Sequence, residues 1–299
     1  MPELPFLEIL AENLVARVSG RRIESIQIYQ PALLQTASPA PMPESFHGEF
    51  FSLSRREGKY LILETESRRA IAIHLMRAGR IAVAAATANR RGSASPAAPR
   101  AARPPKHLSA RLTFDDGSEL HLVEYGTEKR ARLWLLEDAR DLAELRELGP
   151  DPSRGDLTRE RFLAALGAES RQLKTFLADQ RAISGIGNGL SDEILYQARL
   201  SPMKLTGALT GEEAAALHGA VLEVVETQIE RLRKSAGDEL PQKEPREHYA
   251  VHDHAGERCA KCGTTIARVS YADRDTFYCP GCQTGGKPLK DRRLSKLLK

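Results

Sequence analysis

The four cysteines of the chain offer the most specific chemistry. They form two C-x2-C pairs with sixteen residues between them, Cys259 with Cys262 and Cys279 with Cys282. Each pair turns two sulfurs toward one point, and this spacing is typical of a tetrahedral zinc site. Four protein ligands leave no open position, so one structural zinc ion is expected. Two disulfides are the alternative, which a chain without a secretion signal disfavours.

A proline and a glutamate at the start of the chain are candidates for catalysis. Removal of Met1 would leave Pro2 with a free secondary amine. Because α-amino groups titrate near pH ~8, part of this amine is unprotonated near neutral pH and can act as a nucleophile. Glu3 beside it is a candidate general acid or base. The alternatives are a proline without a role and a glutamate that favours the start of its own helix.

A glycine-rich turn, Gly185-Ile186-Gly187-Asn188-Gly189, lies between two helical patterns. Glycine lets backbone N–H groups approach an anion closely, and the following helix adds its positive N-terminal end. The turn is therefore a candidate phosphate site in which Asn188 takes part. The alternative role for Asn188 is a helix cap.

Positive charge is concentrated in two segments, although the formal net charge of the chain is only +4. Residues 90–106 contain five basic residues and no acid, and residues 287–299 contain six basic residues and one acid. Such segments suit a polyanion, and a solvated segment is the alternative. Residues 83–105 are rich in Ala, Arg, Pro, Ser and Gly, which predicts a flexible loop.

The composition is that of a globular protein, with 41% hydrophobic and 28% charged residues. No apolar run approaches the ~18 residues that a membrane-spanning helix needs, so no membrane partner is expected. The N-terminus lacks the basic start and apolar centre of a secretion signal, which favours a cytoplasmic, nucleoid-associated location. A monomer is expected, since nothing in the sequence indicates an oligomer.

The first half of the chain shows strand patterns after one helix. Helical apolar spacing covers residues 7–18 and ends at Gly20, which suits a C-cap. The turn Asp115-Asp116-Gly117 predicts a hairpin. The expected strands are residues 23–29, 60–65, 70–76, 111–114 and 119–123. A β-rich domain is therefore expected over residues 1–135.

After residue 135 the pattern becomes helical. The candidate helices are residues 138–147, 158–166, 173–179, 190–199 and 211–235. Pro150 and Pro152 mark a boundary, so residues 136–152 are expected to be a linker. We expect a helical domain over 153–248, a zinc segment over 249–286 and a basic tail over 287–299. Residues 264–278 are expected to form a hairpin that depends on the metal to fold.

Four features follow one another along the chain. They are Pro2-Glu3-Leu4-Pro5; Lys59-Tyr60-Leu61 followed by His74-Leu75; Asp179-Gln180 with the glycine-rich turn and Asp192-Glu193-Ile194-Leu195; and Asp273-Arg274-Asp275-Thr276-Phe277-Tyr278-Cys279 with Cys282-Gln283. Together they resemble the formamidopyrimidine-DNA glycosylase/endonuclease VIII family of base-excision repair enzymes. Residues 148–152 also fit the interdomain linker of that family, and the resemblance covers nearly the whole chain.

The resemblance implies a multidomain α+β fold: an N-terminal β-sandwich with an N-terminal helix, a helix–two-turn–helix domain and a C-terminal β-hairpin zinc finger. It implies an enzyme that binds damaged double-stranded DNA in a cleft between domains and flips a base. Pro2 would form a Schiff base with the sugar, and elimination would cleave the strand. Glu3 would be the general acid/base. Lys59 would contact the lesion phosphate and assist base release, with a plain phosphate contact as the alternative.

The resemblance also implies residues that bind DNA. Lys174, Asn188 and Arg274 correspond to residues that hold the phosphates beside the flipped nucleotide. His107 corresponds to a histidine that contacts phosphate. Glu193 corresponds to a family carboxylate, and a secondary or structural role is expected for it.

The sequence departs from the family pattern at positions near the lesion. Phe6 stands where a second glutamate is usual, and Arg77 stands where a methionine enters the base stack. The loop that usually reads Arg-Arg-Phe-Gly has Lys129, Arg130 and Ala131, so it lacks the aromatic wedge, whose stacking contributes ~1–3 kcal/mol. Lys129 and Arg130 are expected to fill space or reach phosphate. These departures concern lesion choice more than the fold.

Three function classes follow from these observations. The first is a bifunctional DNA glycosylase/abasic-site lyase acting on oxidised or ring-opened bases, with purine and pyrimidine lesions both open. The second is a non-catalytic or lyase-only paralogue that binds distorted or abasic DNA, which the departures near the lesion motivate. The third is a zinc-ribbon protein that binds RNA or the ribosome. Retention of Pro2, Glu3 and Lys59 favours the first.

Overall fold

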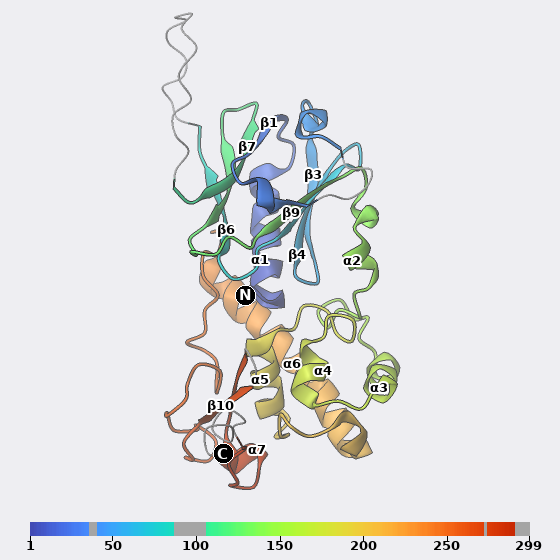
Figure 1. Cartoon of the computed structure of the whole chain (residues 1–299), viewed down its shortest axis with the longest axis vertical. Coiled ribbons are helices and arrows are strands. Elements are labelled where there is room, and N and C mark those ends of the chain that lie inside the picture. The colour runs from blue at the N-terminus through green and yellow to red at the C-terminus, as the bar shows by residue number, and fades with distance from the viewer. Residues whose placement is uncertain (36–40, 87–105, 272–273, 291–299) are drawn as a thin grey trace, which may run out of the picture. The chain divides into compact units, whose positions relative to one another are not determined.

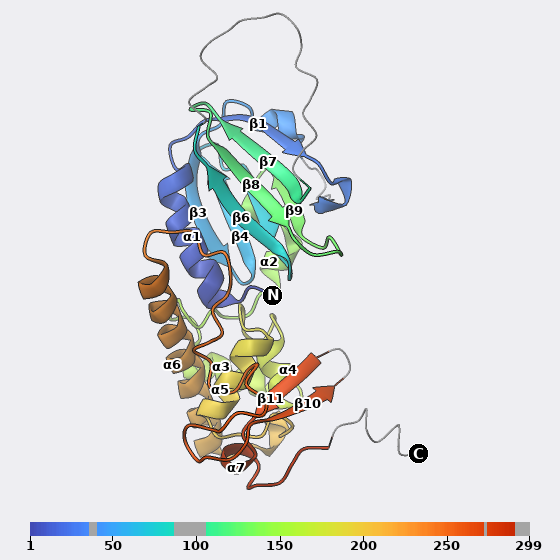
Figure 2. The same ribbon diagram turned by 90° about the vertical axis from the view of Figure 1, so that its left-hand side faces the viewer.

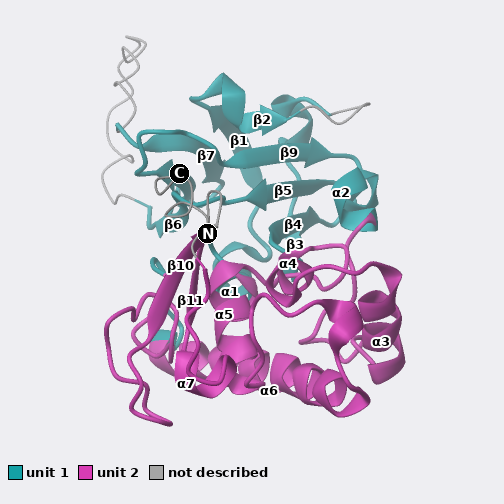
Figure 3. Ribbon diagram, turned by 60° about the horizontal axis from the view of Figure 1, so that its bottom comes forward, with its two compact units in different colours: residues 1–2, 6–146, 236–243 teal, residues 3–5, 147–235, 244–299 magenta. Residues whose placement is uncertain are grey.

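The computed structural model describes residues 1–35, 41–86, 106–271 and 274–290 (Figure 1). The chain forms two compact units (Figure 3). Unit 1 comprises residues 1–2, 6–146 and 236–243, and unit 2 comprises residues 3–5, 147–235 and 244–299. Within the described ranges, no helix is both long and apolar enough to cross a membrane.

Unit 1 is a β-sandwich. Its sheets have the strand orders β1-β7-β8-β6 (Figure 2) and β2-β9-β5-β4-β3 (Figure 3). The rings of Phe51 and Phe114, one from each sheet, pack edge to face with centroids 6.0 Å apart, so the core lies between the sheets. The strands are β1 (Ile23–Ile28), β2 (Leu34–Gln35), β3 (Phe51–Glu57), β4 (Tyr60–Thr65), β5 (Ala70–His74), β6 (Gly79–Ala84), β7 (Leu108–Phe114), β8 (Glu119–Glu124) and β9 (Arg132–Leu136).

Strands β2, β3, β6 and β9 were not predicted, and β3 shows why. Arg55 and Arg56 break its apolar alternation, yet Arg56 is only 1% exposed. Its guanidinium pairs with Glu8 at 2.5 Å and donates to the carbonyl of Gly58 at 3.1 Å, which satisfies the buried charge. Strand β6 includes residues 83 and 84, so the predicted loop starts later than expected. Residues 87–105 of that loop lie outside the described residues.

Helix α1 (Leu4–Val18) begins earlier than the predicted residue 7. Pro5 is tolerated there because the first N–H groups of a helix have no intrahelical partner. The earlier start places Phe6 within the helix, where it is 1% exposed and belongs to the core. The helix predicted over 138–147 is shorter: Asp138 and Asp141 form a capping box around a 3-10 turn, and only α2 (Ala143–Arg146) follows.

Unit 2 contains the other predicted helices. They are α3 (Arg159–Ala168), α4 (Leu173–Ala178), α5 (Asn188–Gln197) and α6 (Gly211–Ala236). Strands β10 (Ala267–Tyr271) and β11 (Arg274–Tyr278) form the predicted hairpin, and α7 (Pro280–Gln283) follows it. Tyr196 of α5 packs with Val251, Ile266 and Phe277 around the cysteines, which joins the helices to the zinc segment. Residues 291–299 of the basic tail lie outside the described residues.

Candidate active site and metal centre

The carboxylate of Glu3 is bound by the N-terminal end of α5. Its Oε2 accepts hydrogen bonds from the backbone N–H groups of Gly187 (2.8 Å) and Leu190 (3.0 Å), and its Oε1 accepts one from Gly189 (2.9 Å). Glu3 is 3% exposed. A carboxylate at this end also meets the positive end of the helix dipole. Glu3 therefore completes a helix 184 residues away in sequence rather than favouring its own helix.

The turn needs glycine at three positions, and at Gly187 the reason is the contact with Glu3. A Cβ on Gly187 would lie 2.5 Å from Cδ of Glu3, and a Cβ on Gly189 would lie 3.0 Å from the ring of Tyr249. Gly185 has a φ of +84°, which other residues rarely adopt. The turn was predicted to bind a phosphate, and in this structure its backbone N–H groups bind the carboxylate of Glu3 instead. A phosphate contact at this turn stays a prediction.

A second carboxyl group, that of Glu244, lies beside Glu3. Its Oε1 accepts a hydrogen bond from the backbone N–H of Glu3 at 3.0 Å, and its Oε2 lies 3.4 Å from Arg246. Burial and, next, the negative charge of Glu3 raise the pKa of Glu244 to about 7. Sequence reasoning missed this residue because nothing in the polar segment 236–248 distinguishes it.

In unit 1, Lys59 lies near His74. Lys59 occupies the turn between β3 and β4 rather than a strand, directly after Gly58 (φ +55°), and it is 5% exposed. Burial, followed by the charges of Lys59 and Arg132, lowers the pKa of His74 to about 4, so its imidazole is neutral at pH ~7. Its Nδ1 accepts the backbone N–H of Met76 at 3.2 Å, which leaves the proton on Nε2.

Glu124 organises the loop that carries Lys129, Arg130 and Ala131. Its Oε1 accepts the backbone N–H groups of Arg130 (2.9 Å) and Ala131 (2.8 Å), and its Oε2 accepts the hydroxyl of Ser109 (3.0 Å). The ammonium of Lys129 donates to the carbonyl of Glu124. Ala131 is 4% exposed, whereas the side chain of Arg130 is 62% exposed. Arg130 is thus the member of this trio best placed to reach a partner in solution.

Two further candidates of unit 1 lie against the same loop. Arg77 is exposed in the turn between β5 and β6. This turn packs on the loop, since a Cβ on Gly126 would lie 2.9 Å from Cβ of Ala78. His107 is half-buried just before β7, and its ring lies 5.1 Å from that of Tyr125, which is 65% exposed. Unit 1 therefore gathers these candidates on neighbouring segments.

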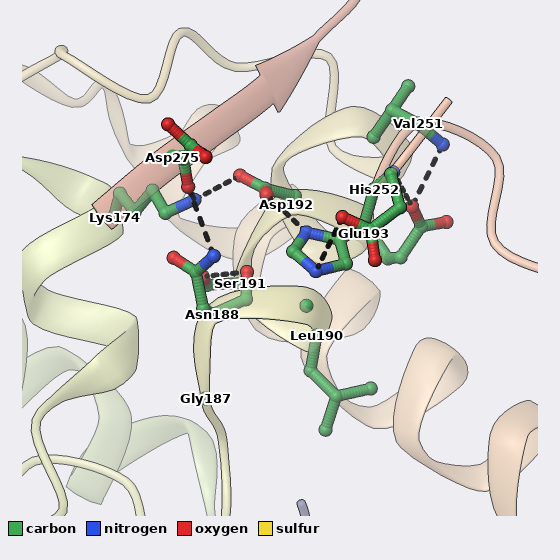
Figure 4. Close-up of polar contacts among 12 residues, drawn as sticks. Lys174, Gly187, Asn188, Leu190, Ser191, Asp192, Glu193, Val251, His252 and Asp275 are labelled. Carbon is green, nitrogen blue, oxygen red and sulfur yellow. Dashed lines mark hydrogen bonds and ion pairs between the residues drawn. The ribbon is translucent and has the colours of Figure 1, made fainter. Parts of the chain in front are cut away.

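Lys174 and Asn188 meet at one backbone oxygen of β11 (Figure 4). The carbonyl of Asp275 accepts hydrogen bonds from Lys174 Nζ (3.1 Å) and Asn188 Nδ2 (3.0 Å). Asp275 directly follows Arg274, whose side chain lies outside the described residues. Lys174 is 8% exposed and forms an internal ion pair with Asp192. Its contact with DNA stays a prediction.

Two acids of α5 tie this helix to the segment before the zinc site (Figure 4). Asp192 Oδ2 lies 2.8 Å from Nδ1 of His252, a buried residue that sequence reasoning missed. Glu193 accepts backbone N–H groups from Ala250 (2.6 Å), Val251 (2.9 Å) and His252 (2.9 Å). Burial raises the pKa of Glu193, and these hydrogen bonds oppose the rise. The contacts of Glu193 are those of a structural residue.

The sulfurs of the four cysteines form one cluster, in which all lie within 4.8 Å of one another. The Sγ atoms of Cys259 and Cys282 are 3.8 Å apart, and those of Cys262 and Cys279 are 3.4 Å apart. Both distances exceed the ~2.05 Å of a disulfide bond. They are close to the ~3.8 Å between ligands of a tetrahedral site with Zn–S bonds of ~2.3 Å. The cluster therefore fits a four-coordinate metal ion.

Three family models match successive parts of the chain. The formamidopyrimidine-DNA glycosylase N-terminal domain matches residues 1–127, the formamidopyrimidine-DNA glycosylase H2TH domain residues 148–238, and the zinc finger found in FPG and IleRS residues 256–285. The formamidopyrimidine-DNA glycosylase of Symbiobacterium thermophilum is 33% identical over 304 residues, which cover 98% of this chain and 93% of that protein. The chain belongs to the formamidopyrimidine-DNA glycosylase/endonuclease VIII family.

Other members of this family agree with the assignment. An uncharacterized formamidopyrimidine-DNA glycosylase-like protein of Mycobacterium tuberculosis is 41% identical over 154 residues, which cover 52% of this chain and 96% of that protein. The structure of MutM in complex with carbocyclic 8-oxo-G containing DNA has a TM-score of 0.78 at 25% identity and covers 95% of this chain and 100% of that one. A Lactococcus lactis Fpg complex with abasic-site DNA, at 24% identity, has a TM-score of 0.78 and covers 94% and 99%. The fold is that of the formamidopyrimidine-DNA glycosylase family.

Proposed function

We propose that the chain is a bifunctional DNA glycosylase and abasic-site lyase acting on oxidised or ring-opened bases in duplex DNA. Membership of a DNA glycosylase family supports this activity. The observation that carries the proposal is the carboxylate of Glu3, which three backbone N–H groups hold in place directly beside Pro2 in the chain.

Pro2 supplies the nucleophile once Met1 is removed. The lone pair of its secondary amine attacks C1′ of the damaged nucleotide, and the base leaves with the electrons of its bond to C1′. The departing base takes up the proton that the new ammonium loses, so the nitrogen regains a lone pair. The C1′–O4′ bond then breaks toward O4′, which opens the sugar and leaves a C1′=N⁺ Schiff base. This iminium acidifies the C2′ proton. Loss of that proton expels the 3′ phosphate and cleaves the strand.

Glu3 is suited to exchange a proton with O4′. A carboxylate has about four lone-pair positions, and backbone N–H groups fill three of them here, which leaves one for a proton. Because those bonds fix the carboxylate, the proton is delivered from a defined position. Lys59 would hold the phosphate beside the lesion and assist base release.

Unit 2 supports the binding of damaged double-stranded DNA. One N–H of the Asn188 amide binds the carbonyl of Asp275, and the same amide carries a second donor that suits a phosphate oxygen. Arg274 would bind the neighbouring phosphate from β11. A structural zinc ion on the four cysteines would hold that hairpin in place and takes no part in the reaction. The enzyme would act as a monomer on DNA in the cytoplasm.

Borohydride trapping tests this proposal. The untagged protein should form a covalent adduct with a duplex that contains an abasic site. An adduct with an 8-oxoguanine duplex would show that the altered loop accepts a purine lesion, and its absence would direct the search to oxidised pyrimidines and ring-opened purines. A short extension ahead of Pro2 converts the amine into an amide, so it should abolish trapping and preserve DNA affinity. An adduct from that blocked protein would remove Pro2 from the mechanism.

A paralogue that binds damaged DNA without excising bases is the second candidate. It is favoured by Ala131, which is buried where an aromatic wedge is usual in the family. Tight binding of both duplexes with no adduct on either would establish this alternative. An adduct on the abasic duplex, with no excision of any lesion base, would indicate a lyase-only enzyme.

A further inference from the structure

The proposed function leaves one buried acidic group without a role. Glu244 lies between α6 and the zinc segment, and its side chain is 12% exposed. Its Oε1 accepts the backbone N–H of Glu3 at 3.0 Å, across 241 positions of sequence. The contact is to the peptide that joins Pro2 to Glu3, so Glu244 helps to fix the position of the N-terminal segment.

This hydrogen bond also places a titratable oxygen close to the reacting amine. Three covalent bonds of ~1.46, ~1.52 and ~1.33 Å separate the nitrogens of Pro2 and Glu3, which keeps these two atoms less than ~4 Å apart. Glu244 Oε1 therefore lies within ~7 Å of the Pro2 nitrogen. Charges at this separation interact appreciably in a partly buried site.

The charged groups around Glu244 come from three segments. The N-terminal segment supplies the carboxylate of Glu3 and the positive amino group of Met1, whose place the Pro2 amine takes once Met1 is removed. The segment of Glu244 itself supplies Arg246 and Tyr249. Burial raises the pKa of Tyr249, and the negative charge of Glu193 of α5 adds to this rise. Burial and Glu3 raise the pKa of Glu244 to about 7, while the amino group of Met1 and the guanidinium of Arg246 oppose the rise. An N-terminal amine titrates near pH ~8, so the two groups change charge over overlapping ranges.

We propose that Glu244 is a positioning residue of the Schiff-base chemistry, which fixes the Pro2–Glu3 peptide and sets the pH at which the Pro2 amine becomes nucleophilic. This inference rests on the proposed function, in which that amine is the nucleophile. An ionised Glu244 stabilises the ammonium form of Pro2 and raises the pKa of the amine. The amine and the carboxyl therefore titrate as a coupled pair.

Glu244→Gln separates the positioning role from the charge. The amide oxygen of glutamine still accepts the N–H of Glu3, whereas the negative charge is lost. For unit charges ~7 Å apart and an effective dielectric constant between ~20 and ~80, the pKa of the Pro2 amine falls by ~0.4 to ~1.7 pH units. On the acidic limb of the pH–rate profile, the rate follows the fraction of unprotonated amine. At a given pH there, the rate of Schiff-base formation in Glu244→Gln is therefore ~3- to ~50-fold higher than in the parent protein.

The experiment is single-turnover borohydride trapping on an abasic duplex from about pH 5 to 9. Glu239→Gln is the matched control, since it removes the same charge from a side chain that is 89% exposed and screened by solvent. The acidic limb of the pH–rate profile of Glu244→Gln should move to lower pH, and its plateau rate should stay within ~2-fold of that of the parent protein. The acidic limb of Glu239→Gln should not move. A Glu244→Gln limb that superimposes on the parent, or moves to higher pH, overturns the proposal.

Direct titration of the Pro2 amine by carbon-13 NMR makes the test independent of activity. A lower amine pKa in Glu244→Gln supports the proposal, and identical titration curves overturn it. Glu244→Asp retains the negative charge, so its Pro2 amine should titrate close to that of the parent protein. This variant therefore distinguishes an effect of lost charge from an effect of misfolding. An absence of adducts in every protein would contradict the proposed function instead, and the titration would still decide the role of Glu244.

Discussion

Replacing Gly187 with alanine tests most directly how Glu3 is held. The φ of Gly187 is −125°, outside the left-handed region that favours glycine, so the main obstacle to alanine is space. The new Cβ would lie 2.5 Å from Cδ and 2.6 Å from Oε1 of Glu3, closer than such atoms approach. The carboxylate has to move, and its hydrogen bonds to Gly187, Gly189 and Leu190 stretch or break.

The magnitude follows from these bonds. A hydrogen bond to a charged group contributes ~1.5–3 kcal/mol, and overpacking of a filled site costs ~1–3 kcal/mol. Because a shifted carboxylate keeps part of its bonds, we expect the free energy of unfolding to fall by ~2–4 kcal/mol. A displacement of ~1 Å can slow a positioned reaction ~100-fold, and we expect a loss of that size in the trapping rate.

Urea unfolding and trapping kinetics measure the two effects. Gly219→Ala in α6 is the control: its Cβ would meet nothing within 4 Å, and helix propensity predicts a gain of up to ~1 kcal/mol. Glu3→Ala removes the group with which the new Cβ collides, so Gly187→Ala should destabilise that background much less. Equal losses in both backgrounds, or an unchanged trapping rate, would refute this account of how Glu3 is held.

Three other predictions concern the metal, the DNA and pH. Cys279→Ser should release the metal and weaken DNA binding, and full metal content in this variant would contradict the four-sulfur site. Arg274→Ala should lower affinity for all sequences and reduce the salt slope by ~1, whereas an unchanged slope would mean that Arg274 does not touch phosphate. The pKa of His74 is about 4 in the folded protein, below its unfolded value of ~6.5. Because the unfolded chain takes up this proton first, the free energy of unfolding present above pH ~6.5 falls as the pH drops to 4, by at most ~3 kcal/mol. Urea unfolding of His74→Gln should show a flatter loss over this window, and an identical loss would contradict the assignment.

Features set by local spacing could be predicted from the sequence. Cys259 and Cys262 lie in one short turn, as do Cys279 and Cys282, and a hairpin between the pairs brings all four sulfurs together. The helices of unit 2 were predictable because apolar residues recur there at helical spacing between glycine and proline boundaries. The glycine-rich run before α5 was recognisable as a tight turn whose backbone N–H groups could bind an anion, but the sequence did not show that the anion is the carboxylate of Glu3.

Contacts between distant residues could not be predicted. Nothing in the sequence near Glu3 indicates that its carboxylate binds a helix 184 residues later, or that Glu244 binds its backbone. Strand β3 was missed because the burial of Arg56 depends on Glu8 of another element. The ion pair of Lys174 with Asp192 was likewise not foreseen, and the phosphate contact that the resemblance implies for Lys174 stays a prediction. In each case the partner decides whether a charge can be buried, and the partner is known only from the fold.

The hydrogen bonds of Glu3 also join residues that the ribosome synthesises at very different times. A ribosome adds ~5–20 residues per second, so the 184 residues between Glu3 and Gly187 take ~10–40 seconds to synthesise. During this interval the carboxylate of Glu3 has no α5 to bind. Glu244 emerges later still. Although it is synthesised first, Glu3 can therefore form its hydrogen bonds to α5 and to Glu244 only after most of the chain has been synthesised.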